Sequence, residues 1–577
     1  MNNEVGERVT SLACESGNNR FKDFIKENRL MIFIIVLLLV KQLLVTGIPI
    51  FAHSGAGHDD RLMINMADSL INGQWLGNYS EKTLVKGIFF PLFLKINSCF
   101  GIPYSIAVSV FYSFADIVFI LGIKKLFKTE YPLYIIFFVL IFNPISFADE
   151  TFLRVYRNSL TAGEVLIVAG SMIGMYLNRN EKNGPFIFWA VLSGLGLAAL
   201  WHTREDGIWI IPLVLMVIMI TWVSIFLKKG LSKKEKGKKT VITGIPVVML
   251  ILSTLIISSI NYNYYGIFTT NELNNSNFTD TIKLIYSVQA SEDIDRVSVP
   301  RSTVEKLYEV SPSLNKIRAE LDSSLDRWSW YDQDAKVREV EDGFFFWALR
   351  EAISNAGYYQ NAEMANEFYN QVNGELEAAF ESGKINKRAT MPSALMSPWR
   401  DSYWQELPKS FFVTIHYIAG FKSVETSIST SIDDGHNGIR LFEKVTNNLA
   451  RYPGEDISGS DQIRVGMLNL ITSIYQAFGV ILFLLAGIGY VVISVLILFK
   501  KWRMKFNLLD FWLVLSGLLG SMCVLAIGVA YTDISAYVAI SYWYLAGAYP
   551  LIIAFNIIAL YKITEIVITG SYKRKKK

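Results

Sequence analysis

Residues 30–50 read LMIFIIVLLLVKQLLVTGIPI, an apolar stretch in which Lys41 is the single charged residue. A run of this length spans the hydrocarbon core of a bilayer as a helix, because exposed backbone polar groups find no water there. It is longer than the apolar core of a secretory signal peptide, about 7–15 residues, and a charged segment precedes it. We therefore expect a membrane helix that the mature protein keeps.

Similar stretches recur along the chain, so the sequence predicts a polytopic α-helical membrane protein with about ten transmembrane helices. Its 577 residues are 52% hydrophobic and 18% charged, whereas soluble domains carry about 25% charge. The mean hydropathy is +0.32. Three cysteines, Cys14, Cys99 and Cys523, exclude a disulfide framework and any CxxC-type zinc or redox motif. The predicted spans are residues 30–50, 103–123, 131–148, 160–177, 185–201, 208–227, 240–262, 467–499, 508–531 and 536–561.

Basic residues between the spans predict the orientation, because cytoplasmic loops carry an excess of lysine and arginine. With ten spans and a cytoplasmic N-terminus, every basic cluster falls on the cytoplasmic side; nine or eleven spans break this agreement. We expect an integral plasma (inner) membrane protein with both termini in the cytoplasm. The clusters are Arg20, Lys22, Lys26 and Arg29; Lys124, Lys125 and Lys128; seven lysines within 228–239; Lys500, Lys501, Arg503 and Lys505; and residues 573–577.

Residues 263–465 form a polar block that is long enough for an extracytoplasmic domain, between spans seven and eight. It holds 20 Lys and Arg against 30 Asp and Glu, a net charge of −10, which argues against a nucleic-acid partner. Its patterns are mainly helical, over 342–357 and 362–383, while Phe411–Ile418 has the alternative of a strand. The remaining units are a cytoplasmic segment 1–29, a membrane module 30–262, three helices within 466–562, and a basic cytoplasmic tail 563–577.

The first outer loop, residues 51–102, contains the sequence His58-Asp59-Asp60 directly after the first span. One carboxylate is suited to take a proton from an acceptor hydroxyl, while the other orients it or holds a divalent metal. Asp60 and His58 are the candidate metal ligands. The alternative is that an aspartate caps the amphipathic helix that follows, in which Leu62, Met63, Met66, Leu70 and Ile71 recur at helical spacing.

Further ionisable residues fall on the same predicted face, where charges at the edge of hydrocarbon usually line a polar cavity. Arginine suits a phosphate because its planar fork bonds two oxygens at once. Tyr542, Trp543 and Tyr544 are typical of an interfacial aromatic belt, with contact to a sugar as the alternative. The candidate phosphate-binding residues are Lys86, Arg154, Arg157 and Arg204, and the other site candidates are Asp149, Glu150, His202, Glu205 and Asp206.

This arrangement over residues 30–262 resembles the C-type (GT-C) glycosyltransferases, membrane enzymes that use polyprenyl-phosphate-linked sugars. Three short motifs carry the resemblance. His58-Asp59-Asp60 stands where the family has its acidic motif, and Lys86-Gly87-Ile88-Phe89-Phe90-Pro91-Leu92 is similar to an element that precedes the second span. Thr203-Arg204-Glu205-Asp206-Gly207 resembles an Arg-x-(Glu/Asp)-Gly turn. The soluble domain departs from the family pattern, because many members carry it at the C-terminus.

The resemblance implies an inverting transfer of a sugar from a polyprenyl phosphate to a glycan, lipid or protein of a bacterial cell envelope. Asp59 or Asp60 would be the base, with Asp59 preferred, and the cations would balance the phosphate. A nucleotide is not expected, and a divalent metal (Mg or Mn) is a candidate cofactor. The alternatives are a transporter or channel, for which Lys41 and Asp116 lie at membrane depth, a non-enzymatic envelope-assembly scaffold, and a related lipid-linked phosphoryl or oligosaccharide transfer.

Overall fold

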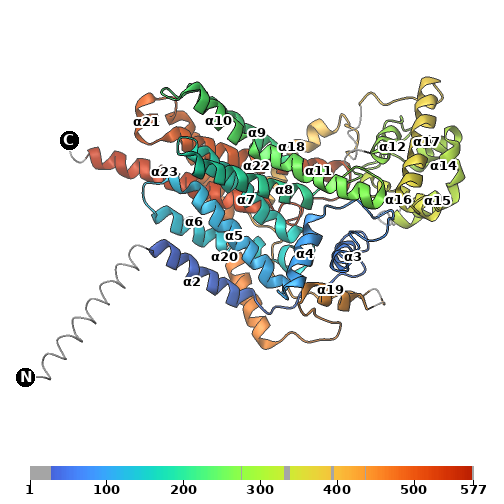
Figure 1. Ribbon diagram of the computed structural model, residues 1–577, viewed down its shortest axis with the longest axis horizontal. Coiled ribbons are helices and arrows are strands. Elements are labelled where there is room, and N and C mark those ends of the chain that lie inside the picture. Colours follow the sequence, from blue (N-terminus) through green and yellow to red (C-terminus); the bar gives the residue numbers. More distant parts are fainter. Residues whose placement is uncertain are drawn as a thin grey trace, which may run out of the picture.

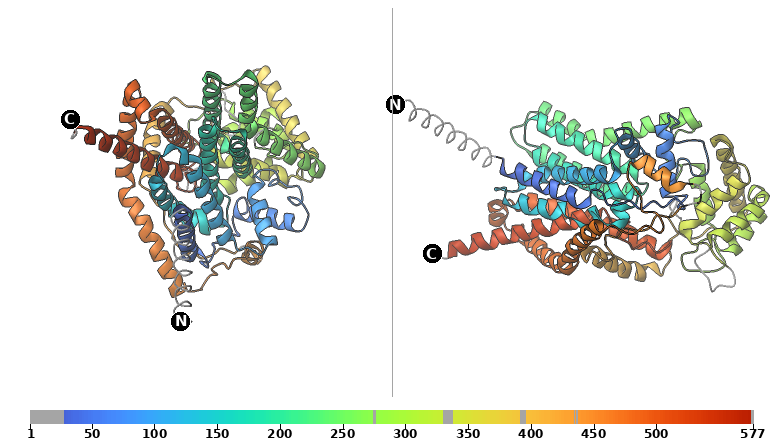
Figure 2. Two further views of the ribbon diagram at one scale, coloured as in Figure 1. Left: turned by 60° about the vertical axis from the view of Figure 1, so that its left-hand side comes forward. Right: turned by 90° about the horizontal axis from the view of Figure 1, so that it is seen from below.

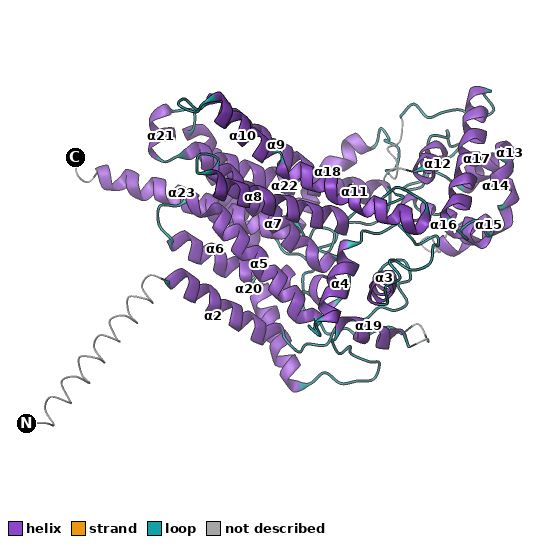
Figure 3. Cartoon of the chain, in the orientation of Figure 1, coloured by secondary structure: helices purple, strands orange, loops and turns teal. Residues whose placement is uncertain are grey.

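The computed structural model describes residues 28–273, 276–329, 338–390, 396–433, 435 and 437–574, the last five by backbone alone. These residues form helices joined by turns and loops, with isolated β-bridges and no strand (Figure 3). Eight of the described helices are long and apolar enough to cross a membrane, so the chain is a polytopic helical membrane protein. They are α5 (Tyr104–Ile123), α7 (Asn158–Asn178), α8 (Asn183–Thr203), α9 (Ile211–Leu227), α11 (Ile245–Tyr265), α20 (Gly459–Leu496), α22 (Leu508–Ser535) and α23 (Ala548–Arg574).

Two of the ten predicted spans form shorter helices. The span over 30–50 is α2 (Arg29–Val45), and the span over 131–148 is α6 (Tyr131–Ile141) with a 3-10 turn at Pro144–Ser146. Helices of 17 and 11 residues rise about 26 and 17 Å. Both values fall short of a hydrocarbon core of roughly 30 Å. The number of crossings therefore stays a prediction.

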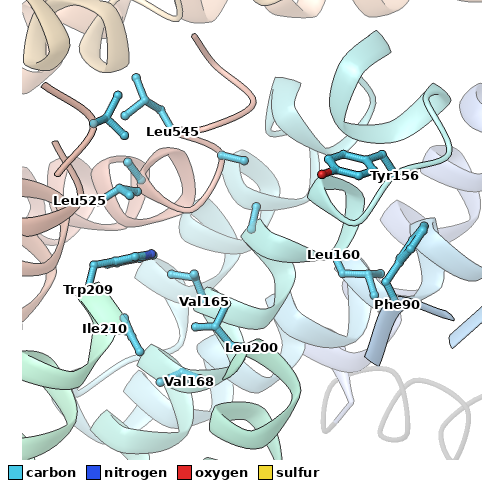
Figure 4. Close-up of a cluster of buried hydrophobic side chains, with 14 of the residues drawn as sticks. Phe90, Tyr156, Leu160, Val165, Val168, Leu200, Trp209, Ile210, Leu525 and Leu545 are labelled. Carbon is cyan, nitrogen blue, oxygen red and sulfur yellow. The ribbon is translucent and has the colours of Figure 1, made fainter. Parts of the chain in front are cut away.

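Helix α7 is the centre of the bundle, and nearly all of its side chains are buried. It packs against α5 on one side and α8 on the other. The α5–α7 contact depends on two glycines, since a Cβ at Gly170 would stand 2.5 Å from the Cα of Phe119, and one at Gly122 would stand 2.0 Å from the Gly170 carbonyl oxygen. Small residues allow such close approach of membrane helices. Buried apolar side chains from α7, α8 and α22 fill the adjacent core (Figure 4).

The two ends of the bundle differ in what they carry. At one end lie α10 (Lys233–Thr243), α21 (Lys500–Lys505) and the end of α23 (Figure 1). At the other end is a group of helices that we call the outer helices (Figure 2). Cys14, Arg20, Lys22, Lys26 and residues 575–577 lie outside the described residues. The outer helices are α12 (Asn277–Tyr286), α13 (Arg301–Val310), α14 (Pro312–Lys316), α15 (Arg318–Trp328), α16 (Asp342–Asn355) and α17 (Ala362–Glu381).

Two stretches differ from the expectations drawn from the sequence. Phe411–Ile418 lies inside α18 (Tyr403–Ala419), a helix that packs along α22, so the strand alternative is wrong. Its buried residues Ser410, Thr414 and Ile418 recur every four positions, which is helical spacing. The last span was expected to begin at residue 536, but α23 begins at Ala548. Residues 536–547 instead form a turn, because the Asp533 carboxylate accepts hydrogen bonds from the N–H groups of residues 539 and 540 at 2.9 and 3.1 Å.

Residues 51–102 form α3 (Asp60–Ile71), which is the predicted amphipathic helix, and α4 (Phe89–Cys99). The two helices pack on each other and on α19 (Gly438–Thr446). Residues 50–53, which precede α3, form isolated β-bridges with two other parts of the chain. Ile50 and His53 form parallel bridges with Ala450 and Ile432, and Phe51 forms one with Arg154. Segments about 100 and 380 to 400 residues away in the sequence thus fix the position from which the His58–Asp60 sequence emerges.

Candidate functional site

Asp59 and Asp60 stand at the start of α3, and their carboxylates meet different surroundings. Asp59 occupies the N-cap position, but its side chain makes no capping hydrogen bond. Its Oδ1 accepts hydrogen bonds from Lys86 Nζ at 3.0 Å and from the Tyr156 hydroxyl at 2.8 Å. Because 45% of the side chain is exposed, its carboxylate is also open to a ligand. The helix-cap alternative does not describe what this side chain does.

The charges of Asp59 and Lys86 stabilise each other. Burial raises the pKa of Asp59, but the Lys86 ammonium, the hydrogen bonds from Lys86 and Tyr156, and the Arg157 guanidinium outweigh it and hold the pKa well below its usual range. Burial and Arg157 lower the pKa of Lys86, but Asp59, Tyr156 and Glu205 outweigh them and raise it. Asp59 is therefore ionised and Lys86 cationic at neutral pH.

Asp60 is fully buried and is held by Arg154. Arg154 Nε and Nη2 donate to its two carboxylate oxygens at 2.8 and 2.6 Å, and Nη1 donates to Glu150 Oε2 at 2.7 Å. Burial raises the pKa of Asp60, against the guanidinium, which lowers it. With 0% of its side chain exposed, Asp60 orients Arg154 and does not reach a ligand. Glu150, with 32% exposed, is the open carboxylate of this group.

Gly87 brings Lys86 against the turn that follows α8. A Cβ at Gly87 would stand 2.1 Å from the carbonyl oxygen of His202, so the two backbones meet only because residue 87 has no side chain. The Gly87 N–H donates to Glu205 Oε1 at 3.1 Å, and Arg157 Nη1 donates to Glu205 Oε2. The Lys-Gly element and the Arg-Glu-Asp-Gly turn, both noted in the sequence, are thus in direct contact.

Arg204 is buried and forms a two-point ion pair with Asp206. Its Nε and Nη2 donate to the Asp206 oxygens at 2.7 Å each, and Nη1 donates to Asn158 Oδ1 at 2.6 Å. Burial raises the pKa of Asp206, but Arg204 outweighs it and lowers the pKa to about 2. Because 54% of the Asp206 side chain is exposed, this carboxylate is also accessible to a ligand.

Asp149 connects the site to the turn between α22 and α23. Its Oδ1 accepts a hydrogen bond from the Tyr542 hydroxyl, and its Oδ2 accepts one from Ser427 at 2.8 Å. The Tyr542 hydroxyl also lies 3.2 Å from the Glu150 N–H. Tyr542 therefore connects the turn before α23 to residues 149 and 150. The aromatic-belt interpretation did not predict this contact.

The two histidines have different roles from those expected of ligands. The His58 ring packs 5.1 Å from Trp328 and 4.9 Å from Trp347, and burial and Lys82 lower the pKa of His58 to about 4. The His202 ring pairs with the Ser253 hydroxyl at 3.0 Å, so that residue contributes to the site through its backbone carbonyl.

The candidate metal ligands do not fit a metal. Both Asp60 oxygens are bound to Arg154, and the His58 ring lies between two indoles. Among the described residues, no three His, Cys, Asp or Glu side chains are placed to hold an ion.

The four predicted phosphate-binding cations all lie at this site, but each is paired with a carboxylate. Six carboxylates surround four cations, so the cluster carries two negative charges in excess. An incoming phosphate must therefore displace a carboxylate from its cation. The pairs are Lys86 with Asp59, Arg154 with Asp60 and Glu150, Arg157 with Glu205, and Arg204 with Asp206, while Asp149 is bound to Tyr542.

Tyr156 and Trp347 belong to the site but were not foreseen from the sequence. Tyr156 lies between Arg154 and Arg157 in the sequence. Its position next to two predicted phosphate-binding residues could have indicated that it belongs to the site. Trp347 stands with its ring centroid 5.7 Å from Lys86 Nζ. Nothing in the 342–357 pattern separates this residue from core residues of the same helix.

Lys41 and Asp116 lie apart from this site, on α2 and α5. Both are buried, and their opposite charges interact. Lys41 Nζ and Asp116 Oδ2 have no hydrogen-bond partner among the described residues.

Comparison with models of known protein families and with curated protein sequences gave no match. The family resemblance therefore rests on the three short sequence motifs.

Proposed function

We propose that the chain is an inverting glycosyltransferase of the GT-C type, which transfers a sugar from a polyprenyl phosphate to an acceptor hydroxyl at the outer face of the membrane. The observation that carries this proposal is the asymmetry of the two aspartates. Asp59 is ionised and 45% exposed, whereas Asp60 is buried on Arg154. Two neighbouring carboxylates with separate environments suit a base and a positioning group.

The transfer takes one displacement. The acceptor hydroxyl gives its proton to Asp59, its oxygen forms a bond to the anomeric carbon, and the bond from that carbon to the phosphate oxygen breaks, which inverts the centre. The phosphate leaves as an anion on its lipid. Protonation removes the negative charge of Asp59, so Lys86, 3.0 Å away, becomes free to balance the departing phosphate.

Binding of the donor also prepares the base. A carboxylate whose pKa is held low by a cation is a weak proton acceptor. A phosphate that takes up the charge of Lys86 or Arg157 removes the interactions that lower the pKa of Asp59. Arg204 offers a second phosphate contact, because its partner Asp206 is exposed and free to turn into solvent.

Donor turnover by purified protein in nanodiscs tests the proposal. A panel of polyprenyl-phosphate sugars is supplied with envelope extract, and free polyprenyl phosphate is measured. We expect Asp59→Asn to lower the rate by about 10²-fold or more, and Asp401→Asn, an exposed carboxylate on the loop before α18, to leave it unchanged. Equal turnover in Asp59→Asn and the wild-type protein would contradict the assignment of the base. If neither the wild-type protein nor Asp59→Asn consumes any donor, the result would favour a scaffold role.

The same assay tests the metal requirement. We expect turnover to persist in EDTA, because the candidate ligands His58 and Asp60 are engaged by other side chains. Loss of turnover that Mg²⁺ or Mn²⁺ restores would show a metal site that the geometry does not indicate.

Transport is the second candidate function, and the buried pair of Lys41 and Asp116 favours it. Ionisable residues at membrane depth usually mark an ion or proton path. Solute or proton flux in proteoliposomes that Asp116→Asn abolishes, with no donor turnover, would support transport over transfer.

A further inference from the structure

Aromatic side chains from distant parts of the chain stand next to one another beside Asp59. Trp328, Phe344 and Trp347 come from the outer helices, and Tyr537 and Tyr544 come from the turn before α23. Ring centroids are 6.1 Å apart for Trp328 and Phe344, 5.8 Å for Phe344 and Tyr537, and 5.9 Å for Tyr537 and Tyr544. We call these five side chains the aromatic wall.

One end of the aromatic wall meets the charged site at Lys86. Within the wall, Trp347 is joined to Trp328 by the His58 ring, which lies 4.9 Å from Trp347 and 5.1 Å from Trp328. Lys86 Nζ stands 5.7 Å from the centroid of Trp347. The ammonium that binds Asp59 therefore lies over an indole face, which is a favourable cation–π arrangement.

The other end meets the charged site at Arg154. Tyr544 packs on Trp543 at 5.3 Å, and the Arg154 guanidinium lies 5.0 Å from the Trp543 ring and 5.4 Å from the Tyr156 ring. Tyr156 and Lys86 both donate hydrogen bonds to Asp59. The aromatic wall and the charged residues therefore form a continuous ring of contacts, and Asp59 lies on its charged side.

The aromatic wall is rigid and partly open. Its members Trp328, Phe344, Tyr537 and Tyr544 are half-buried. Trp328 is fixed by donation of its indole N–H to Glu351 at 2.6 Å. A Cβ at Gly343, at the start of α16, would stand 2.3 Å from the Tyr537 ring, so α16 and the turn are closely packed. Aromatic faces held in this way form a binding surface at little entropic cost.

Two polar groups beside the aromatic wall are buried without a partner. The Trp543 indole N–H and the Ser541 hydroxyl make no hydrogen bond to any described residue. Buried donors without partners are rare, and such groups usually await a water or a ligand. Both lie in the turn that also carries Tyr537 and Tyr544.

We propose that the aromatic wall is the acceptor subsite and that the acceptor is a neutral saccharide. This inference rests on the proposed function and names its acceptor class. A pyranose presents C–H groups on one face, which suits the negative face of an aromatic ring. Its hydroxyls donate to open carboxylates, of which Asp59, Glu150 and Asp206 are exposed by 45%, 32% and 54%.

The charge of this region separates a neutral saccharide from an anionic acceptor. The site has two more carboxylates than cations, and residues 263–465 carry a net charge of −10. Like charges repel an anionic polymer from such a surface. The hydrogen-bonding carboxylates also disfavour a purely apolar acceptor, which would leave them without partners.

Binding without donor is the first test. Full-length protein in nanodiscs is titrated with neutral oligosaccharides and with an anionic glycan, and saturation-transfer NMR and tryptophan fluorescence are recorded. Trp328→Leu and Tyr537→Leu are expected to weaken neutral-saccharide binding by about three- to tenfold, the value of an aromatic contact. Trp328→Phe and Tyr537→Phe keep an aromatic face and are expected to retain it. Trp404→Leu, at a tryptophan of α18 that is 72% exposed, is the matched control.

Kinetics with donor are the second test. The two leucine variants are expected to raise the acceptor KM by about three- to tenfold and leave the donor KM unchanged. Saccharide binding that the leucine variants lose, with no donor turnover in any protein, would keep this inference and overturn the proposed function. Donor turnover with an unchanged acceptor KM in folded leucine variants, or preferred binding of the anionic glycan, would overturn this inference and leave the proposed function standing.

Discussion

Asp59 and Asp60 follow each other in the chain, yet only Asp59 is open to a ligand. Asp59 is the N-cap residue of α3 and bonds to Lys86 and Tyr156, whereas Asp60 is the first helical residue and is buried on Arg154. Residue type alone gives no sign of this difference. At the residue scale, the chemistry is set by which cation each carboxylate meets.

The pH dependence of activity follows from the Asp59–Lys86 pair. Lys86 lowers the pKa of Asp59, so the wild-type base stays ionised as the pH falls, and its protonation limits the rate only in strongly acidic solution. Lys86→Met is expected to raise this pKa and move the acid limb of the kcat/KM profile to higher pH. Rates measured between pH 4 and 8 check this shift. An acid limb at the same pH in both proteins would contradict it.

The stability of the fold also depends on the Asp59 carboxylate, and it is expected to decrease as the pH falls. A carboxyl group with a lowered pKa in the folded state stabilises the fold above its ordinary pKa of about 4, and this contribution is lost as the pH falls further. Lys86→Met is therefore expected to flatten the acidic part of the profile of thermal midpoint against pH.

Arg154 and Asp60 form a buried ion pair, and breaking it is expected to lower the free energy of unfolding strongly. Arg154→Met leaves the buried Asp60 without its partner, and breaking such a pair costs on the order of 3–5 kcal/mol. The double variant Arg154→Met, Asp60→Leu removes both charges and is expected to recover part of the loss. Thermal unfolding in detergent measures both. A double variant as unstable as the sum of the singles would argue against direct pairing.

Elements were easier to foresee than the contacts between them. Apolar runs predict the helices well, because lipid demands internally bonded backbone and leaves few alternatives. The helices over 342–357 and 362–383, and the amphipathic helix that follows Asp59, are confirmed. The turn at 536–547 was missed, since the Asp533 carboxylate that holds it is a single polar residue before an apolar stretch. The pairing of Lys86 with Asp59, of Arg154 with Asp60 and of Arg157 with Glu205 was also missed, because the partners are 27, 94 and 48 residues apart in the sequence.

The α5–α7 crossing tests the role of small residues at the element scale. Gly170→Ala places a methyl group 2.5 Å from the Cα of Phe119, and overpacking of this kind typically costs about 1–3 kcal/mol. Gly520→Ala in α22 meets no atom within 4 Å and is expected to be neutral or stabilising by up to about 1 kcal/mol. Thermal midpoints of the two variants in the same detergent compare them directly.

A substitution at Gly87 is expected to change the position of Lys86 more than the stability of the protein. Gly87→Ala meets the His202 carbonyl and should displace Lys86 from Asp59, with a loss of donor turnover larger than the loss of thermal stability. Gly184→Ala, with open space around it near the start of α8, is the control. Full turnover in Gly87→Ala would show that the contact does not position Lys86.

At the scale of the whole molecule, α10 and α21, which are rich in lysine and arginine, lie at the opposite end of the bundle from the outer helices (Figure 1). The orientation predicted from lysine and arginine counts places α10 in the cytoplasm and the outer helices outside. In a background without native cysteines, Lys384→Cys after α17 should react with an impermeant maleimide in intact cells, and Lys233→Cys in α10 should react only after permeabilisation. The reverse pattern would invert the proposed topology.

The parallel bridges around residues 50–53 bear on the order in which the protein matures during synthesis. Ile432 and Ala450, which hold the chain before Asp59, leave the ribosome almost 400 residues after the first helix has been inserted. Proteins fold from the N-terminus as they are made, so helices α2 to α11 are in place while the candidate site is still incomplete. If the chain is the proposed transferase, a nascent chain that stalls before residue 432 is expected to be inserted and inactive. The candidate site is completed late, by the segment that pairs with residues 50–53.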